Sequence, residues 1–138
     1  MIRTDREYEF AKMYFDWVCR CLEEDELYEE LAYFRLGTEL SIRQLELSNI
    51  KFSQVEYPYI LNIKISKKNQ LNTTYDPMKI SKETYDAINK IDNGDRDKIF
   101  VKPPLHYINK IRMSIGDIEF NGVRIRKIGT SLRLGKIF

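Results

Sequence analysis

The chain contains 138 residues, of which 43% are hydrophobic, 12% aromatic and 32% charged. This composition supplies enough large apolar side chains for a packed core, and it excludes a wholly disordered or collagen-like chain. No apolar run reaches the ~18 residues of a membrane-spanning helix, and charged residues begin at Arg3. We therefore expect a cytoplasmic protein with one domain over residues 1–138, without a secretory signal and without a membrane partner.

The two parts of the chain differ in charge. Residues 1–49 contain 6 Lys and Arg against 12 Asp and Glu, whereas residues 50–138 contain 17 against 9. The net charges are therefore −6 and +8, although the whole chain carries only +2. This asymmetry predicts a basic half that meets an anionic partner, or opposite ends that pair in a homo-oligomer. Two solvated faces that merely differ in charge are the alternative.

The most regular pattern predicts a helix from Thr4 to about Leu22. Thr4 and Glu7 have the spacing of a capping box, in which the hydroxyl accepts a hydrogen bond from the Glu7 backbone. Two apolar stripes follow at spacings of three and four residues, and they would cover about half of the helix circumference. The first stripe is Tyr8, Ala11, Phe15, Val18 and Leu22, and the second is Phe10, Tyr14, Trp17 and Cys21. We expect this helix to pack against two elements, or against its own domain and a second subunit.

Three more helices are expected further along the chain. One begins near Leu27 with Gly37 as its C-cap, and a short one falls within residues 38–47. Ser81 is placed to cap another helix, which runs to Ile91.

Strands are expected mainly in the second half. Residues 51–56 and 59–65 are rich in β-branched and aromatic side chains, and Pro58 separates them. Residues 99–101 form a further short apolar run, while residues 105–113 fit a helix or a strand equally well.

The end of the chain carries the clearest β pattern. Asn121-Gly122 suits a type I′ turn, so residues 118–126 predict a hairpin, and residues 132–138 a further strand. Its cations would then project from one side of a β ribbon, because alternate residues of a strand share a face. The sequence thus predicts an α+β fold, in which a mainly helical half (residues 1–49) packs on a mainly antiparallel sheet with a C-terminal hairpin or meander (within residues 50–138).

Residue patterns for catalysis or cofactor binding are lacking. Cys19 and Cys21 would point about 200° apart on a helix, so they cannot share a metal or form a disulfide. The six glycines are scattered and do not form a phosphate-binding loop. Asn62 precedes Lys64 where a metal-dependent nuclease needs a carboxylate. We predict no metal and no cofactor, and an enzyme centred on His106, the one histidine, is a minor hypothesis.

The first functional hypothesis is a non-enzymatic, nucleic-acid-associated accessory or regulatory protein. The basic ribbon would bind phosphates, since arginine forks suit them and each neutralised phosphate adds salt-dependent affinity. A charged outer sheet face that protects an exposed edge is the alternative explanation. The predicted contact residues are Arg124, Arg126, Lys127, Arg133 and Lys136, with Lys64, Lys67 and Lys68 extending the patch.

The second hypothesis is a protein-binding module or inhibitor, of the kind that phages and other mobile elements encode. It would act through the acidic, aromatic helical half, because large aromatic side chains are the usual anchors of protein interfaces. The predicted anchors are Tyr14, Trp17, Tyr28 and Tyr33. The partner would be a protein surface, or a second copy of the chain in a homo-oligomer.

Overall fold

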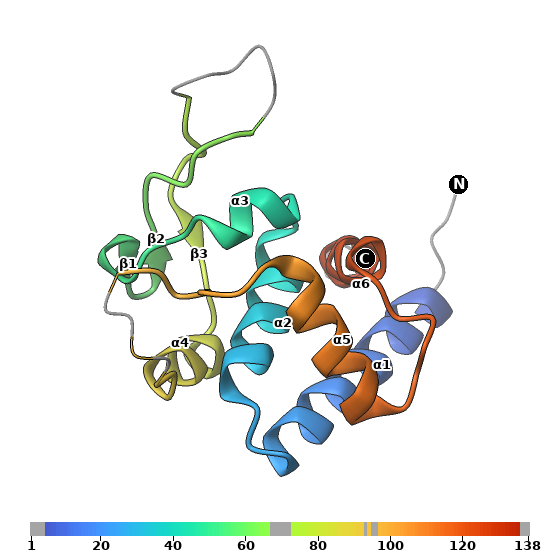
Figure 1. The fold of residues 1–138 in the computed structure, drawn as a ribbon. Coiled ribbons are helices and arrows are strands. Elements are labelled where there is room, and N and C mark those ends of the chain that lie inside the picture. Colours follow the sequence, from blue (N-terminus) through green and yellow to red (C-terminus); the bar gives the residue numbers. More distant parts are fainter. Residues whose placement is uncertain (1–4, 67–72, 93, 95–96, 136–138) are drawn as a thin grey trace.

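The computed structural model describes residues 5–66, 73–92, 94 and 97–135. Within these residues, six α-helices and a small antiparallel sheet give a broadly α+β fold (Figure 1). The helices are α1 (Asp5–Glu24), α2 (Tyr28–Leu40), α3 (Gln44–Ser48), α4 (Lys82–Asn89), α5 (Pro104–Ile115) and α6 (Gly122–Gly135). The strands are β1 (Val55–Glu56), β2 (Tyr59–Ile60) and β3 (Met78–Lys79), and a short 3-10 helix covers Phe52–Gln54. In the part of the chain described, none of the helices is of a length and hydropathy that would let it span a membrane.

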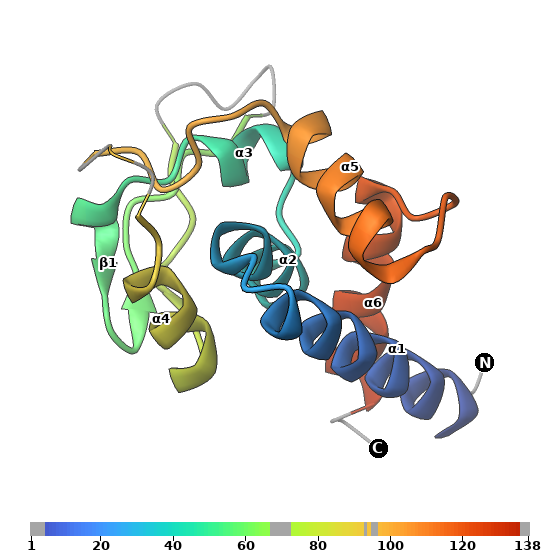
Figure 2. The same ribbon diagram turned by 60° about the horizontal axis from the view of Figure 1, so that its bottom comes forward.

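Helix α2 lies at the centre of the molecule and contacts α1, α3, α4, α5 and α6 (Figure 1, Figure 2). Nine of its thirteen residues are buried, so other elements enclose most of its circumference. Tyr33 stacks on Tyr107 of α5 with ring centroids 4.7 Å apart, and Phe34 stacks on Phe15 of α1 at 5.5 Å. The buried apolar side chains of α2 are Leu31, Ala32, Tyr33, Phe34, Leu36 and Leu40.

Helix α1 confirms the predicted N-terminal helix and ends two residues beyond Leu22. Val18 and Leu22 of the first stripe are fully buried, and Ala11 is 5% exposed. The helix packs against three elements, α2, α5 and α6, where two elements, or the domain and a second subunit, were expected. Thr4 lies outside the described residues, so the predicted capping box stays a prediction.

The sheet is much smaller than predicted. Its order is β1-β2-β3, with Val55 paired to Ile60 and Tyr59 to Lys79. The longer strands expected at residues 51–56 and 59–65 are wrong, because the chain finds a neighbouring strand over only two residues at a time. The expected strand at 99–101 is wrong as well: Ile99 and Phe100 are buried, and the Phe100 ring packs edge-on against Tyr33.

Two helices of the second half follow local signals. Ser81 caps α4 as predicted, since its hydroxyl accepts a hydrogen bond from the backbone N–H of Thr84 at 3.2 Å. Of the two alternatives for residues 105–113, the helix is correct. Pro104 occupies the first position of α5, where a missing N–H costs nothing, and Gly116 ends the helix with φ of 70°.

The predicted C-terminal hairpin is wrong, because residues 122–135 form helix α6. Asn121 is not a turn residue but caps this helix: its side-chain oxygen accepts the backbone N–H of Arg124 at 2.9 Å. Ile125 and Ile128 are buried and Leu132 is half-buried, at the spacings of three and four that place them on one helix face. The strand predicted at 132–138 is wrong up to residue 135, and its last three residues lie outside the described ones.

Two glycines allow α2 and α6 to cross closely. A Cβ atom on Gly37 would lie 2.6 Å from Ile125 Cγ2, and one on Gly129 would lie 2.1 Å from the Thr38 carbonyl oxygen. The prediction that Gly37 is the C-cap of this helix is wrong. Helix α2 continues to Leu40, and its C-cap is Ser41, whose φ is 51°. The close crossing fixes α6 against the central helix.

Candidate functional site

Arg124 is half-buried, and its guanidinium interacts with other side chains of the same chain. Its Nη1 lies 2.8 Å from Asp117 Oδ2 and 3.3 Å from the Tyr14 hydroxyl, and its guanidinium stands 5.7 Å from the Tyr14 ring centre. The backbone N–H of Glu119 and this arginine both help to hold the pKa of Asp117 below its ordinary value. Arg124 thus joins α6 to α1 and to the loop before α6, and its charge is neutralised within the chain.

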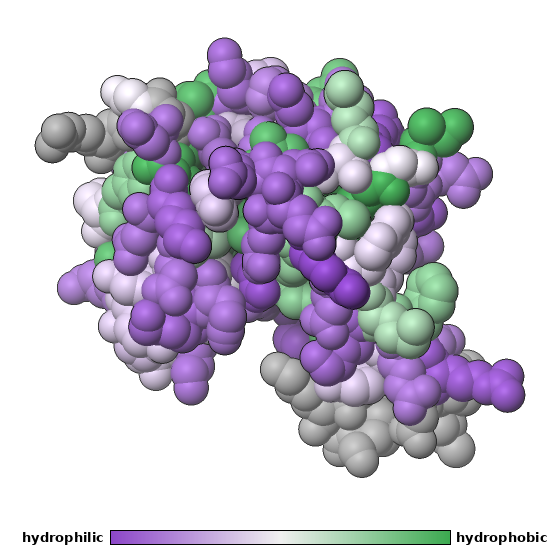
Figure 3. Space-filling view, turned by 90° about the horizontal axis from the view of Figure 1, so that it is seen from below, coloured by the Kyte–Doolittle hydropathy of each residue, from purple (hydrophilic) through white to green (hydrophobic). Residues whose placement is uncertain are grey.

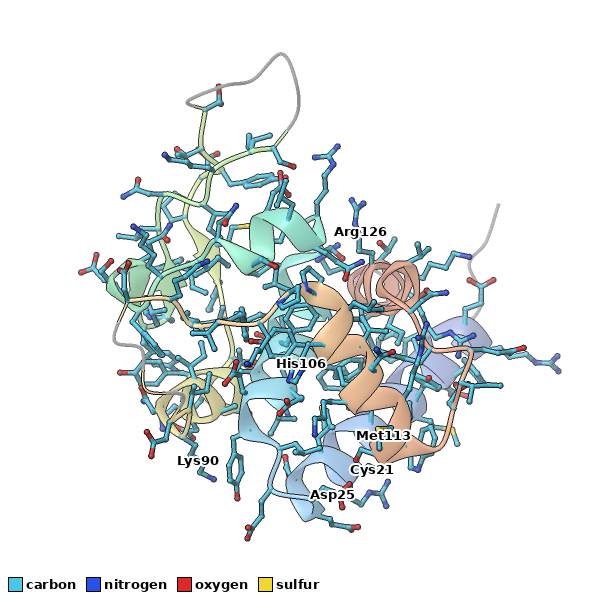
Figure 4. All side chains as sticks on the ribbon, viewed as in Figure 1. Cys21, Asp25, Lys90, His106, Met113 and Arg126 are labelled. Atoms are coloured by element: carbon cyan, nitrogen blue, oxygen red, sulfur yellow. The ribbon has the colours of Figure 1, made fainter. Side chains whose placement is uncertain are left out.

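The other predicted cations do not form a one-sided ribbon. Residues two apart on a helix point about 200° apart, so Arg124 and Arg126 face different directions. Arg126 and Lys127 are exposed, and Figure 4 shows the Arg126 side chain directed away from the helices. Arg133 donates instead to the backbone carbonyl of Glu39 at 3.0 Å. The predicted basic β ribbon is therefore wrong.

The remaining predicted cations lie on other segments. Lys64 is exposed and forms an isolated bridge with Thr74. Lys67, Lys68 and Lys136 lie outside the described residues, so their predicted role stays a prediction.

The four predicted aromatic anchors fall in different surroundings. Tyr33 is wrong as an anchor, because it is completely buried in the core. Tyr28 is half-buried, and the Lys90 ammonium stands 4.9 Å from its ring centre. Tyr14 and Trp17 share the outer side of α1 with Phe10.

These three side chains form a continuous aromatic row on α1. The ring centroids of Phe10 and Tyr14 are 6.3 Å apart, and those of Tyr14 and Trp17 are 5.6 Å apart. Phe10 is 71% exposed and Trp17 37%, and Met13 beside them is 72% exposed. The second stripe is therefore open to solvent at Phe10 and Trp17, while its Tyr14 and Cys21 are half-buried against the core.

Two hydrogen bonds hold the end of α5 and the loop after it beside this row. The Tyr14 hydroxyl donates to Asp117 Oδ2 at 2.9 Å, and the Ser114 hydroxyl donates to Asp25 Oδ2 at 2.6 Å. Met113 and Ile118, each the chain neighbour of one of these residues, are 79% and 86% exposed.

We call this surface the apolar face; it comprises Phe10, Met13, Trp17, Met113 and Ile118. Figure 3 shows hydrophobic patches among hydrophilic ones on the side where Figure 2 places α1 and α5. Sequence periodicity indicated Phe10 and Trp17 of this face, but not Met13. It missed Met113 and Ile118, because their position depends on where α5 ends and how the loop returns.

The charges around the apolar face are unevenly placed. At the C-terminal end of α1, four successive carboxylates, Glu23 to Glu26, are all exposed. At the opposite end, Arg6 and Lys127 line a groove of about 440 Å³ between α1 and α6, together with Phe10 and Tyr14. The face thus has a negative end at the end of α1, whereas the groove at the other end contains both signs of charge, because Glu7 lines it as well.

The structure gives little basis for catalysis at His106. Its Nε2 lies 3.9 Å from Glu30 Oε2, and its ring packs edge-on against Tyr107. Within the described ranges, no serine, threonine or cysteine is hydrogen-bonded to this imidazole, so the pair lacks the nucleophile that the minor hypothesis requires. The same residues contain no group of three His, Cys, Asp or Glu side chains that could hold a metal ion.

Comparison of the chain with protein-family models, with curated proteins and with solved structures gave no significant match.

Proposed function

We propose that the protein is a protein-binding module that acts through the apolar face. The observation that carries this proposal is the exposure of Phe10, Met13 and Trp17 on one side of a helix whose first stripe packs in the core. Contiguous exposed apolar surface on a soluble protein is typical of interaction sites. Trp and Met are also among the residues enriched at protein interfaces.

The charges beside the apolar face indicate which kind of partner it would bind. A segment that covers the row and reaches Glu23 to Glu26 meets four exposed carboxylates. The matching partner is an amphipathic helix with an apolar stripe and a lysine- or arginine-rich end, because opposite potentials steer encounter and fix orientation. Inhibition of the partner, as in the second sequence hypothesis, is one consequence that such binding would have.

A titration with designed peptides tests this proposal. The probe is a helical peptide with leucines at helical spacing and lysines at one end, and its control has glutamates in place of the lysines. The chain contains one tryptophan, Trp17, so its fluorescence reports directly on the face. We expect the lysine peptide to shift Trp17 emission to shorter wavelength with saturation, and the glutamate peptide to bind at least about tenfold more weakly.

Substitutions locate the contact. Met13→Ser should weaken binding of the lysine peptide, whereas Leu45→Ser, which changes a comparably exposed apolar residue on α3, should not. Equal binding of both peptides, or equal effects of both substitutions, would contradict the proposal. A stable dimer of the unliganded protein in light scattering would show instead that a second copy covers the face.

The basic ribbon that motivated the nucleic-acid hypothesis is absent from the described residues. Four exposed cations remain from its list: Arg126, Lys127 and Arg133 on α6, and Lys64. The ratio of absorbance at 260 and 280 nm, measured on purified protein before and after nuclease treatment, separates the two functions. Co-purifying nucleic acid would favour the first hypothesis over the proposal made here.

A further inference from the structure

A second surface, on the other side of α1, has a different character. A cleft of about 680 Å³ opens between α1, α2, the β3–α4 junction and α6. Figure 3 shows the molecule hollowed between α4 and the side formed by α1 and α6, with hydrophilic walls. Lys12 and Phe15 line the cleft from α1, and on a helix Lys12 points about 200° away from Phe10. The cleft and the apolar face are therefore independent.

Three cations converge on this cleft from three elements: Arg35 from α2, Lys79 from β3 and Arg133 from α6. No ion pair to any of them is found within the described ranges. The Arg35 guanidinium stands 5.2 Å from the Phe15 ring centre, and Arg133 uses one N–H on the Glu39 carbonyl. Among the described residues, no carboxylate therefore neutralises the three cations, although the chain contains 21 acidic residues.

Two carboxylates, Glu39 and Glu83, line the cleft beside these cations, and among the described residues neither forms an ion pair with them. Glu39 also lines the cleft, but its side chain accepts the Ser81 N–H at 3.0 Å, the Ser81 hydroxyl at 2.6 Å and the Thr84 hydroxyl at 2.9 Å. These bonds direct it toward the start of α4, where its oxygens accept hydrogen bonds from neutral donors. Lys12, the fourth cation of the cleft, is paired with Asp16 at 3.5 Å.

We propose that the cleft binds a phosphorylated small molecule of about the size of a mononucleotide, with its phosphate between Arg35, Lys79 and Arg133. A tetrahedral dianion can accept hydrogen bonds from three directions, and arginine forks match its oxygens. The volume lies within the ~300–1,000 Å³ of small-molecule sites. Ile80 and Leu132 line the same cleft and supply apolar contact for the rest of the ligand.

The experiment is calorimetric titration of the full chain with three probes: AMP, adenosine and inorganic phosphate. We expect AMP to bind with saturation, and adenosine to bind at least about tenfold more weakly because it lacks the phosphate. Lys79→Gln and Arg35→Gln should each weaken AMP binding about tenfold or more. Arg20→Gln and Lys110→Gln remove exposed cations outside the cleft and should leave AMP binding unchanged.

Three outcomes would overturn the proposal. They are no saturable AMP binding up to about 1 mM, equal AMP binding by Lys79→Gln and the parent, and tighter binding of a single-stranded oligothymidylate that grows with its length. The last result would show an extended nucleic-acid path rather than a closed small-molecule site. Lys79 is an exposed residue, and the unchanged circular dichroism of its variant would separate lost binding from lost folding.

Discussion

Helices α1 and α2 lie against each other and are both rich in aromatic side chains, yet they relate to solvent in opposite ways. Other elements surround α2, and its apolar side chains are buried. Helix α1 places one stripe in the core and leaves Phe10 and Trp17 outside it. An exposed apolar side chain adds little to the stability of the fold, because it is not removed from water on folding. The apolar residues of α2 therefore maintain the structure, whereas those on the outer side of α1 are available for a partner.

The largest expected effect is on the α2 side of this comparison. Phe34 is fully buried, stacks on Phe15 and lies 5.9 Å, between ring centroids, from Phe120. Phe34→Ala should lower the free energy of unfolding by about 3–5 kcal/mol, since it removes apolar contacts and leaves a cavity. Urea unfolding measures this loss. A loss below about 1 kcal/mol would mean that α2 is not the centre of the core.

The same contrast holds for carboxylates. Those of Glu23 to Glu26 at the end of α1 are exposed, whereas Glu46 on α3 is only 2% exposed. Burial raises the pKa of Glu46, but hydrogen bonds from the backbone of Ser66 and Arg43 and from the Tyr75 hydroxyl outweigh it, so the net pKa is lowered. Glu46 therefore fastens α3 to two distant parts of the chain.

Because the pKa is lower in the folded state, Glu46 stabilises the protein at neutral pH, and this stabilisation is lost as the pH falls through 4.5 toward the lowered value. Glu46→Gln should reduce the free energy of unfolding by about 1.5–3 kcal/mol at pH 7. The variant should also lose less stability than the parent on acidification. Glu24→Gln on α1 is the control and should leave both measurements nearly unchanged. An unaltered pH profile for Glu46→Gln would contradict the interpretation.

A smaller effect is expected where α6 crosses α2. Alanine normally stabilises a helix by ~1 kcal/mol relative to glycine. A Cβ on Gly129 would, however, lie 2.1 Å from a backbone carbonyl oxygen that cannot rotate away. Gly129→Ala should therefore be destabilising overall, by about 1–2 kcal/mol in urea unfolding. Thr130→Ala, one residue further along and facing solvent, is the matched control, and equal stability of the two variants would show that the crossing is loose.

The local sequence was sufficient to predict that α1 is a helix, but it was not sufficient to predict that α6 is one. In α1, five residues from Tyr8 to Leu22 follow the helical period without competition, so the predicted helix was correct. In the tail, Ile125, Ile128 and Leu132 fit a helix, while Val123 and Ile125 also fit a strand. Asn-Gly serves equally as a tight turn and as a helix start. Only packing against α1 and α2 selects the helix, and that information is not local.

The residues of the candidate sites also fall into two groups, those that the sequence could predict and those that it could not. Tyr14 and Trp17 could be predicted, because a second stripe on one helix is visible in the spacing alone. Arg35 and Lys79 were not predicted, since they lie on different elements and become neighbours only when the chain folds around the cleft. Arg124 was predicted with the wrong role, because its partner Asp117 reaches it only through the loop that precedes α6.

The smallest expected change in stability comes from the outer side of α1, and it completes the comparison with Phe34. Phe10 is 71% exposed, so Phe10→Ala removes little buried surface and should alter the free energy of unfolding by no more than about 0.5 kcal/mol. The same substitution should weaken binding of the lysine-ended peptide at least about tenfold, which the fluorescence of Trp17 would measure. The same substitution, phenylalanine to alanine, should thus affect peptide binding at Phe10 and the free energy of unfolding at Phe34. If Phe10→Ala instead destabilised the protein as much as Phe34→Ala while peptide binding was unaffected, the outer stripe would belong to the core, and α1 would have no free face to offer a partner.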